Sequence, residues 1–218
     1  MSNRKIGAGM IVIDGMDGSG KGVQTRRLRD ALIQAGHKTI LTREPGGSPG
    51  AEEIRRLLVE GEPNKWDSMT ELLLMYAARR SHLVSTIWPA LADDTWVVSD
   101  RFADSSRAFQ GIAGELGLEV VEDIHRITVG DFKPDLTIIL DVPVSVALER
   151  ASARGGNEDR FERKGAAYHE RVRDAFIKIS QSDSERYALI DGSMTMDQVT
   201  AEILRAVRSR LNLSIGNE

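Results

Sequence analysis

The stretch MIVIDGMDGSGKG, residues 10–22, decides the fold of this chain. Residues 10–14 are mostly apolar and β-branched, which predicts a buried strand of a parallel sheet. Residues 15–21 follow the pattern G-x-x-x-x-G-K, and residues 23–35 have the composition of a helix. A strand, a glycine-rich loop and a helix in this order predict a phosphate-binding loop.

Each part of this loop has a chemical reason. Glycines let backbone N–H groups close around phosphate oxygens, and the N-terminus of the following helix favours negative charge. Lys21 adds a mobile positive charge for the β and γ phosphates. We therefore predict that the chain binds a nucleoside triphosphate. The residues expected against its phosphates are Gly15, Met16, Asp17, Gly18, Ser19, Gly20, Lys21 and Gly22.

One position departs from the usual pattern. The residue after the lysine is normally Ser or Thr, whose hydroxyl group helps to hold Mg²⁺. Here it is Gly22, and Val23 carries no hydroxyl group either. The alternative interpretation of the whole stretch is a glycine-rich turn that binds no ligand.

Length and composition narrow the class of protein. A chain of 218 residues fits one α/β domain, 1–218, with a small mobile insert. The formal net charge of −4, from 29 basic and 33 acidic residues, argues against a dedicated nucleic-acid binder but leaves room for a locally basic cleft. Without cysteine there is no disulfide framework and no thiolate zinc site. No apolar stretch is long enough to span a membrane and residues 1–9 lack the apolar core of a signal peptide, so we expect a cytoplasmic protein.

Strand-like and helix-like segments alternate along the chain, which predicts a parallel sheet covered by helices on both faces. In such folds ligands bind at the carboxyl ends of the strands. Three expected strands end in charged residues, which should converge beside the phosphate loop: Asp14, Arg43-Glu44 and Asp100-Arg101. The expected strands are 10–14, 39–43, 96–100, 136–142 and 187–191. The expected helices are 23–35, 51–60, 68–92, 119–129, 143–154, 165–183 and 196–211, and residues 212–218 are expected to fray.

Two of these strand ends carry arginines suited to phosphate. Arg43 precedes a Pro-Gly-Gly turn that begins at Pro45, and Arg101 follows Asp100. A guanidinium group binds phosphate oxygens in a bidentate manner, and a carboxylate such as Asp100 holds Mg²⁺ directly or through water. The alternative at both places is a surface ion pair, which contributes little to stability.

Two further segments suggest binding groups. Met75 and Arg79 share one helix face because they are four residues apart, so together they suit a nucleobase, although methionine at this spacing also fits core packing. Arg150, Arg154, Arg160 and Arg163 surround a glycine-containing stretch, which predicts a lid over about 150–164. Arginines that close over a phosphoryl group stabilise its charge and exclude water. The alternative is a solvated charged loop, and the four histidines show no metal-ligand spacing.

The order of these motifs resembles that of the bacterial thymidylate kinase family, from about residue 10 to residue 191. After the phosphate loop come TREPGG (42–47), YAAR (76–79), DRF-x-x-S-x-x-A-F-Q-G (100–111), GDFKPDLTIILDV (130–142) and R-A-x-A-R-G (150–155). The resemblance implies a three-layer P-loop NTPase fold, an α/β fold with a five-stranded parallel sheet flanked by helices and a short lid, usually in a homodimer. It also implies transfer of the γ-phosphoryl group of MgATP to dTMP, giving dTDP and ADP, with Mg²⁺ as the cofactor. Neither nucleic acid nor membrane is implied as a partner.

The resemblance implies roles on the ATP side of the site. Residues 15–22 would cradle the ATP phosphates, with Lys21 bridging them. Arg150 would pack on the adenine ring, and Asp100 would lie near Mg²⁺, directly or through water. Arg154 would be a lid arginine that supplies the catalytic cation, as in the bacterial arrangement that lacks a basic residue in the loop.

The dTMP site implied by the resemblance draws on several of these motifs. Asp17 would reach the 3′-hydroxyl group, and Arg79 would bond the thymine ring. Phe109 would lie against the sugar and help to exclude a 2′-hydroxyl group. The full implied set is Asp17, Arg43, Pro45, Met75, Arg79, Arg101, Ser105, Ser106 and Phe109, with the arginines at 43 and 101 near the acceptor phosphate and the two serines beside the base.

Three residues depart from the family pattern. Gly22 replaces the hydroxyl residue but resembles the G-S-G-K-G variant of adenylate kinases. Met75 stands where the family commonly has phenylalanine, and Arg107 stands where a small or amide residue is usual. These departures leave open a kinase for another monophosphate, such as dUMP, and a nucleotide-binding protein without catalysis. A nucleic-acid motor fits less well, because the chain is short and acidic.

Overall fold

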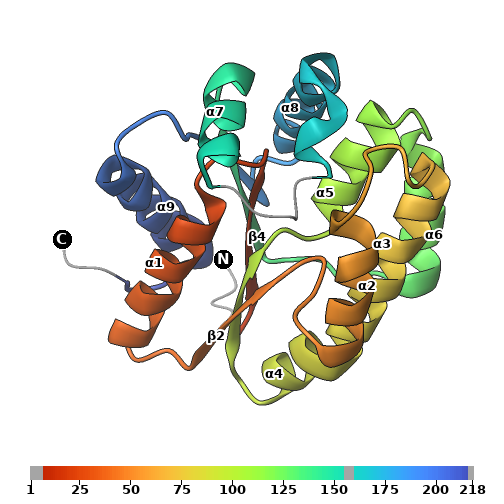
Figure 1. Cartoon of the computed structure of the whole chain (residues 1–218). Helices are drawn as coiled ribbons and strands as arrows, with labels where there is room; N and C mark the ends of the chain where they lie inside the picture. Colours follow the sequence, from red (N-terminus) through yellow and green to blue (C-terminus); the bar gives the residue numbers. More distant parts are fainter. Residues whose placement is uncertain (1–6, 155–159, 216–218) are drawn as a thin grey trace.

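A sheet of five parallel strands forms the centre of the molecule, with helices arranged around it (Figure 1). The computed structural model describes residues 7–154 and 160–215, without the side chain of Arg154. The strand order is β2-β3-β1-β4-β5, and every neighbouring pair is parallel. The strands are β1 (Met10–Gly15), β2 (Thr39–Arg43), β3 (Trp96–Asp100), β4 (Leu136–Asp141) and β5 (Tyr187–Asp191). The predicted five-stranded parallel sheet is therefore confirmed, with strand ends that differ by at most one residue.

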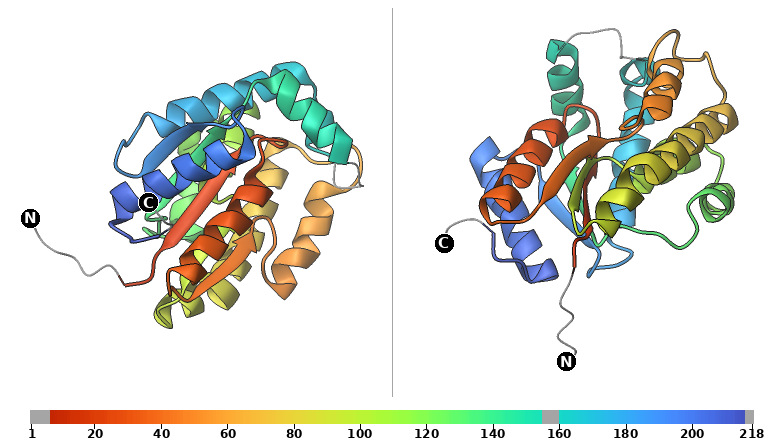
Figure 2. Two further views of the ribbon diagram at one scale, coloured as in Figure 1. Left: turned by 90° about the vertical axis from the view of Figure 1, so that its left-hand side faces the viewer. Right: turned by 90° about the horizontal axis from the view of Figure 1, so that it is seen from below.

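Helices cover both faces of this sheet, which gives three layers. Helices α1 and α9 lie together on one face, and α3, α5, α6 and α8 lie on the other (Figures 1 and 2). The α-helices are α1 (Lys21–Gln34), α2 (Pro49–Val59), α3 (Ser68–His82), α4 (Trp88–Ala92), α5 (Ala103–Ser106), α6 (Leu118–Thr128), α7 (Val144–Arg154), α8 (Ala166–Ser180) and α9 (Met196–Leu211). Among the described residues, no helix combines the length and the apolar composition that a membrane span requires.

The central strand β1 shows how the apolar sequence produces the layers. Successive side chains of a strand point to opposite faces. Ile11 and Ile13 pack in the core cluster that contains side chains of α1 and α9, whereas Met10 and Val12 pack with side chains of α3. All four are fully buried. A strand that is covered on both faces has no need of polar alternation, which explains its apolar run.

Two π-helical segments were not predicted. The single helix expected at 68–92 is divided by the π-helix η1 (Leu83–Ile87) between α3 and α4. No helix was expected after β3, yet α5 is followed there by the π-helix η2 (Arg107–Ala113). A π-helical turn breaks the 3.6-residue period on which helix prediction depends, and such turns are frequent at functional sites.

The C-terminal segment was also predicted wrongly. Residues 212–218 were expected to fray, but Ile215 is 1% exposed and belongs to the core cluster beneath α9. Leu213 packs against the same cluster. Burial of an aliphatic side chain stabilises a short segment that has no helix of its own. Residues 216–218 lie outside the described part of the chain.

Candidate active site

A cavity of about 760 Å³ opens at the carboxyl ends of the strands. It has the size of a typical ligand site. The predicted convergence of strand ends is confirmed by backbone hydrogen bonds between them. The N–H group of Glu44 donates to the carbonyl oxygen of Asp100 (2.9 Å), and the N–H group of Arg101 donates to that of Ile13 (3.0 Å). The ends of β1, β2 and β3 therefore form one wall with the glycine-rich loop.

The cavity is locally basic although the chain is acidic overall. Among the described residues, seven basic and four acidic side chains line it. Such an excess of positive charge favours a strongly anionic ligand. The basic residues are Lys21, Arg26, Arg43, Arg55, Arg79, Arg101 and Arg150, and the acidic residues are Asp17, Glu44, Asp100 and Glu162.

The glycine-rich loop leads directly into α1, which begins at Lys21. The Nζ atom of Lys21 donates to the carbonyl oxygen of Met16 (2.5 Å) and lies 4.0 Å from a carboxylate oxygen of Asp17. Lys21 is only 6% exposed. Burial, and next the positive charge of Arg101, lower the pKa of Lys21 to about 8. An incoming phosphate would supply negative charge that favours the protonated form.

Gly18 and Gly22 of the loop differ in the room that their surroundings leave for a side chain. A Cβ atom at Gly18 would stand 1.9 Å from the carbonyl oxygen of Ala147, so no side chain fits where the loop meets α7. A Cβ atom at Gly22 would stand 3.5 Å from Oδ2 of Asp100, which is an ordinary contact. Gly18 is therefore required by packing, whereas the site has room for a side chain at position 22.

The Arg101 guanidinium is held at the strand ends by four hydrogen bonds. Its guanidinium donates to the carbonyl oxygen of Gly15 (2.8 Å), to Oγ of Ser105 (2.9 Å) and to carboxylate oxygens of Asp17 (2.7 Å) and Asp14 (3.2 Å). Its backbone φ is 71°, which is rare for a residue with a side chain. Residues in such conformations cluster at active sites, where the surrounding structure over-determines them.

Asp14 is the buried counter-charge of this arginine. It is 0% exposed and accepts a hydrogen bond from Oγ of Ser105 (2.7 Å). Burial raises the pKa of Asp14 to about 6, although the Arg101 guanidinium acts in the opposite direction. A buried acid with a raised pKa beside a cavity is typical of functional sites.

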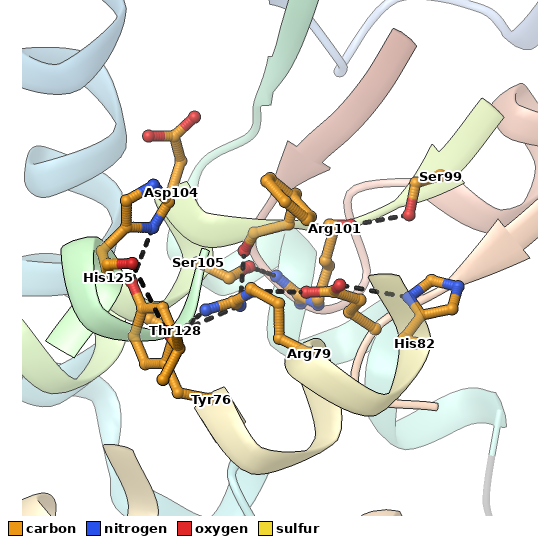
Figure 3. Close-up of polar contacts among 12 residues, drawn as sticks. Tyr76, Arg79, His82, Ser99, Arg101, Asp104, Ser105, His125 and Thr128 are labelled. Atoms are coloured by element: carbon orange, nitrogen blue, oxygen red, sulfur yellow. Dashed lines mark hydrogen bonds and ion pairs between the residues drawn. The ribbon is translucent and has the colours of Figure 1, made fainter. Parts of the chain in front are cut away.

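Arg79, whose polar contacts are drawn in Figure 3, lines the cavity and is 2% exposed. Its Nε donates to Glu44 (2.7 Å), and its terminal nitrogens donate to Oγ of Ser106 (3.1 and 3.2 Å) and to the carbonyl oxygen of Phe102 (3.1 Å). The guanidinium also lies 4.4 Å from the ring centre of Tyr76. These contacts fix the direction in which Arg79 can meet a ligand.

A buried chain of polar groups stands behind Arg79. The second carboxylate oxygen of Glu44 lies 3.1 Å from Nδ1 of His82, whose Nε2 lies 2.6 Å from Oγ1 of Thr42. His82 and Glu44 are both buried. These hydrogen-bonded side chains join the end of β2 to α3, so they fix the position of the two elements relative to each other at the cavity.

The structure gathers most of the predicted site residues around the cavity. Met75 and Arg79 do share a helix face, and both line it. Gly15, Met16 and Ser19 complete the loop behind it. The side chain of Arg154 lies outside the described residues. The predicted residues that line the cavity are Asp17, Gly18, Gly20, Lys21, Gly22, Arg43, Pro45, Met75, Arg79, Asp100, Arg101, Ser105, Ser106, Phe109 and Arg150.

Arg160 and Arg107 do not line the cavity. Arg160, expected in the lid, is fully buried and forms an ion pair with Glu71. Arg107, which departs from the family pattern, is bound to Glu122 (2.6 Å) and Asp104 (2.9 Å) and is not among the residues that line the cavity. The two carboxylates hold the Arg107 guanidinium outside the cavity lining.

Several lining residues were missed because no motif marks them. They come from the first turns of α1, the last turns of α2, η2 and the start of η3 (Glu162–Lys164) with the residue before it. One did carry a signal, since Gln110 belongs to the A-F-Q-G motif. The missed residues include Arg26, Arg55, Val59, Gln110, Phe161 and Glu162.

Gln110 is the most informative of them. It is 1% exposed and its Nε2 donates to Glu71 (3.2 Å). Its Oε1 is buried and has no hydrogen-bond partner within the described part of the chain. An unpaired buried acceptor costs free energy, about 1–3 kcal/mol. A ligand donor in the cavity is one group that could satisfy it.

The P-loop at the end of β1, the parallel sheet and the basic cavity define a P-loop nucleotide-binding protein. Comparison with known proteins specifies the family. Residues 13–203 match the family model described as thymidylate kinase. Over 203 residues the chain is 49% identical to a thymidylate kinase of Caulobacter vibrioides, which covers 93% of this chain and 97% of that protein. It is 46% identical to a thymidylate kinase of Ruegeria pomeroyi, covering 93% of this chain and 95% of that protein. The chain belongs to the thymidylate kinase family.

Proposed function

We propose that ATP and dTMP bind together in this cavity and that the chain transfers the γ-phosphoryl group of ATP to dTMP, giving dTDP and ADP. Its family makes the chain an ATP-dependent kinase of dTMP. The observation that carries the assignment of the site is the meeting of the P-loop lysine with Arg79 and Arg101 in one basic cavity. One space therefore offers a phosphate cradle and further cations for a second anion.

The donor nucleotide is assigned to the side of α1 and α7. The N-terminus of α1 and its Lys21 favour the β and γ phosphates of ATP. Arg150 on α7 lines the cavity and donates to the carbonyl oxygen of Gly192 (3.2 Å), which supports a place for the adenine between α7 and the loop after β5. The role of Arg154 as lid cation, and the lid itself, stay predictions.

The acceptor nucleotide is assigned to the side of α3 and η2. Arg43 and Arg101 suit its phosphate, and Arg79 suits its base. The buried Oε1 of Gln110 offers an acceptor for a donor group of the same ligand. Phe109 is 6% exposed and lines the cavity, in support of a sugar contact.

Phosphoryl transfer requires little covalent chemistry from the protein itself. The attacking oxygen belongs to an anionic phosphate, so no strong general base is needed. Alignment of the two nucleotides and neutralisation of charge by Lys21 and Arg101 are the expected sources of rate.

Mg²⁺ is the proposed cofactor, and Asp100 is its proposed protein ligand. A carboxylate is a ligand that Mg²⁺ prefers, and Asp100 lines the cavity beside Gly22. Among the described residues, no group of three or more metal-binding side chains forms a ready-made site. Water and nucleotide phosphates suit the remaining positions, because Mg²⁺ commonly keeps such ligands. When bound, the ion neutralises part of the phosphate charge.

A homodimer is the proposed assembly. Large apolar side chains are exposed on α3, on the adjoining η1 and on α6, which supports a buried face between two copies. Light scattering of the purified protein tests this, and a mass of one chain would count against it. The exposed side chains are Met69, Leu73, Val84, Leu118 and Ile127. Cytoplasmic location and the lack of nucleic-acid or membrane partners stay predictions.

The assignment of the site is tested by two variants assayed for ADP release with MgATP and dTMP. Lys21→Ala and Arg101→Ala should each lower turnover by about 10²–10³-fold, since each removes one cation aimed at transferring charge. Arg27→Ala is the matched control, because Arg27 is bound to Asp197 and does not line the cavity. Near-wild-type turnover in both active-site variants would reject these roles.

A further inference from the structure

Glu71 on α3 and Arg160 form an ion pair in the interior of the molecule. Nη2 of Arg160 lies 2.5 Å from Oε1 of Glu71, and the two side chains are 0% and 1% exposed. Burying two charges carries a large desolvation cost, and apolar residues of similar volume often give equal or greater stability. The pair therefore needs an explanation other than stability, and its neighbours supply one.

Arg160 joins the last turn of α2 to the cavity wall. Its side chain donates to the carbonyl oxygens of Leu58 (3.1 Å) and Glu62 (3.0 Å). The next residue, Phe161, lines the cavity and packs edge-on against Phe109 with ring centres 5.9 Å apart. The position of the Phe161 ring thus depends on a neighbour that is fixed from three sides.

Glu71 sets the direction of the Gln110 amide. One carboxylate oxygen accepts from Arg160 and from Nζ of Lys164 (2.6 Å), and the other accepts from Nε2 of Gln110 (3.2 Å). An ionised carboxylate only accepts hydrogen bonds, so the Gln110 nitrogen must face it. The amide oxygen must then face the other way, and it is the buried, unpaired Oε1 of a residue that lines the cavity.

We propose that Glu71 and Arg160 are positioning residues for the acceptor nucleotide. The pair fixes the Gln110 amide nitrogen on Glu71, so that the unpaired Oε1 is the amide atom left for a ligand, and it holds Phe161 against Phe109. Neither charged group lines the cavity, so both act through the residues that do. The inference rests on the proposed function, because it assigns this wall to dTMP.

The test separates positioning from stability. In the double variant Glu71→Leu/Arg160→Met both charges of the pair are replaced by apolar groups of similar size, and the melting temperature is measured to show that the variant is folded. Calorimetry should show dTMP binding weakened by about tenfold or more, since hydrogen bonds in a buried site are lost or misdirected. ATP binding should stay within about twofold, and the KM for dTMP should rise more than kcat falls.

A single variant provides a second route if the double variant does not fold. Glu71→Gln keeps the volume but can both donate and accept, so it no longer dictates which way Gln110 turns. It should weaken dTMP binding while ATP binding is kept. Asp197→Asn is the control, because it alters the exposed pair with Arg27 and should change neither nucleotide.

Wild-type dTMP affinity in a folded double or single variant would overturn the inference, as would equal losses for ATP and dTMP. A wild-type protein that releases no ADP with dTMP would instead reject the proposed function. The two failures are therefore distinguishable in one set of measurements.

Discussion

The guanidinium of Arg101 at the end of β3 donates to the carboxylate of Asp17 in the P-loop across 2.7 Å. The same group lies 5.2 Å from the ring centre of Phe109 on η2. The arginine assigned to the acceptor phosphate is thus tied to the loop assigned to the donor phosphates. Catalysis of phosphoryl transfer depends on alignment of the two nucleotides. This link fixes the donor site and the acceptor site relative to each other.

ATP binding should weaken above pH 8. The pKa of Lys21 in the free protein is about 8, so its ammonium group is lost as the pH rises through that value. Phosphates favour the charged form, and binding at higher pH must therefore take up a proton. The expected fall in affinity is up to about tenfold per pH unit. Calorimetry at pH 8.5 in buffers of different ionisation enthalpy measures the uptake directly. The Lys21→Ala variant should show none, and a wild-type protein without uptake would contradict the assigned role.

The free energy of unfolding should fall as the pH rises from about 4 to about 6, because Asp14 then ionises. Its pKa is raised from 3.8 to about 6 in the folded protein, so the folded state binds more protons than the unfolded state in this interval. Ionisation of Asp14 then costs on the order of 3 kcal/mol of unfolding free energy. Urea unfolding should show that the wild type loses about 3 kcal/mol of unfolding free energy relative to Asp14→Asn as the pH rises across this range.

An exposed acid provides the control for this experiment. Asp30→Asn alters a side chain that is 53% exposed, and its unfolding free energy should run parallel to that of the wild type. A parallel course for Asp14→Asn as well would show that the buried carboxyl does not carry the pH dependence.

Substitutions at two P-loop glycines should have opposite effects. Gly18→Ser should abolish turnover or folding, because its Cβ would overlap the backbone of Ala147. Gly22→Ser should fold normally, since its Cβ meets Oδ2 of Asp100 at an ordinary 3.5 Å. Its hydroxyl group stands where related P-loops hold Mg²⁺, so half-maximal activity should need less Mg²⁺. Mg²⁺ titrations at fixed ATP check this; an unchanged Mg²⁺ requirement would show that position 22 lies away from the ion.

Loss of Glu44 should destabilise the protein and weaken dTMP binding together. Glu44→Ala leaves Arg79 buried without its counter-charge, which typically costs about 3–5 kcal/mol. The same change frees Arg79 from the orientation in which it faces the cavity. Chemical unfolding and dTMP calorimetry measure both effects. Glu202→Ala, in an exposed pair with Arg205, should cost at most about 1 kcal/mol and leave dTMP binding unchanged. A stable Glu44→Ala variant with normal dTMP affinity would show that Glu44 does not orient Arg79.

Much of this architecture was predictable because its signals are local. The apolar run at 10–14 and the glycine pattern after it predicted β1 and the P-loop, and the charged strand ends predicted the cavity edge. The π-helix η2 was not predictable, since its period differs from the one that sequence patterns detect. It nevertheless carries Phe109 and Gln110 into the site.

Side-chain partners were the least predictable part of the site. Arg160 lies in an arginine-rich stretch that was expected to form a lid, yet it is buried because Glu71, some ninety positions earlier, provides its partner. Arg107 is likewise held by a partner from another helix, Glu122 on α6. Such pairs depend on tertiary packing between distant helices, which a single sequence does not encode as a local pattern.

Transfer of the γ-phosphoryl group of ATP to dTMP in this cavity is tested by a single assay. ADP release is measured with MgATP and dTMP, dUMP, dCMP, dGMP or dAMP in parallel. We expect rapid release with dTMP, slow release with dUMP and little with the others, which would show that Met75 and Gly22 are compatible with thymidylate kinase activity. Faster release with another acceptor, or none with any of the five, would contradict it.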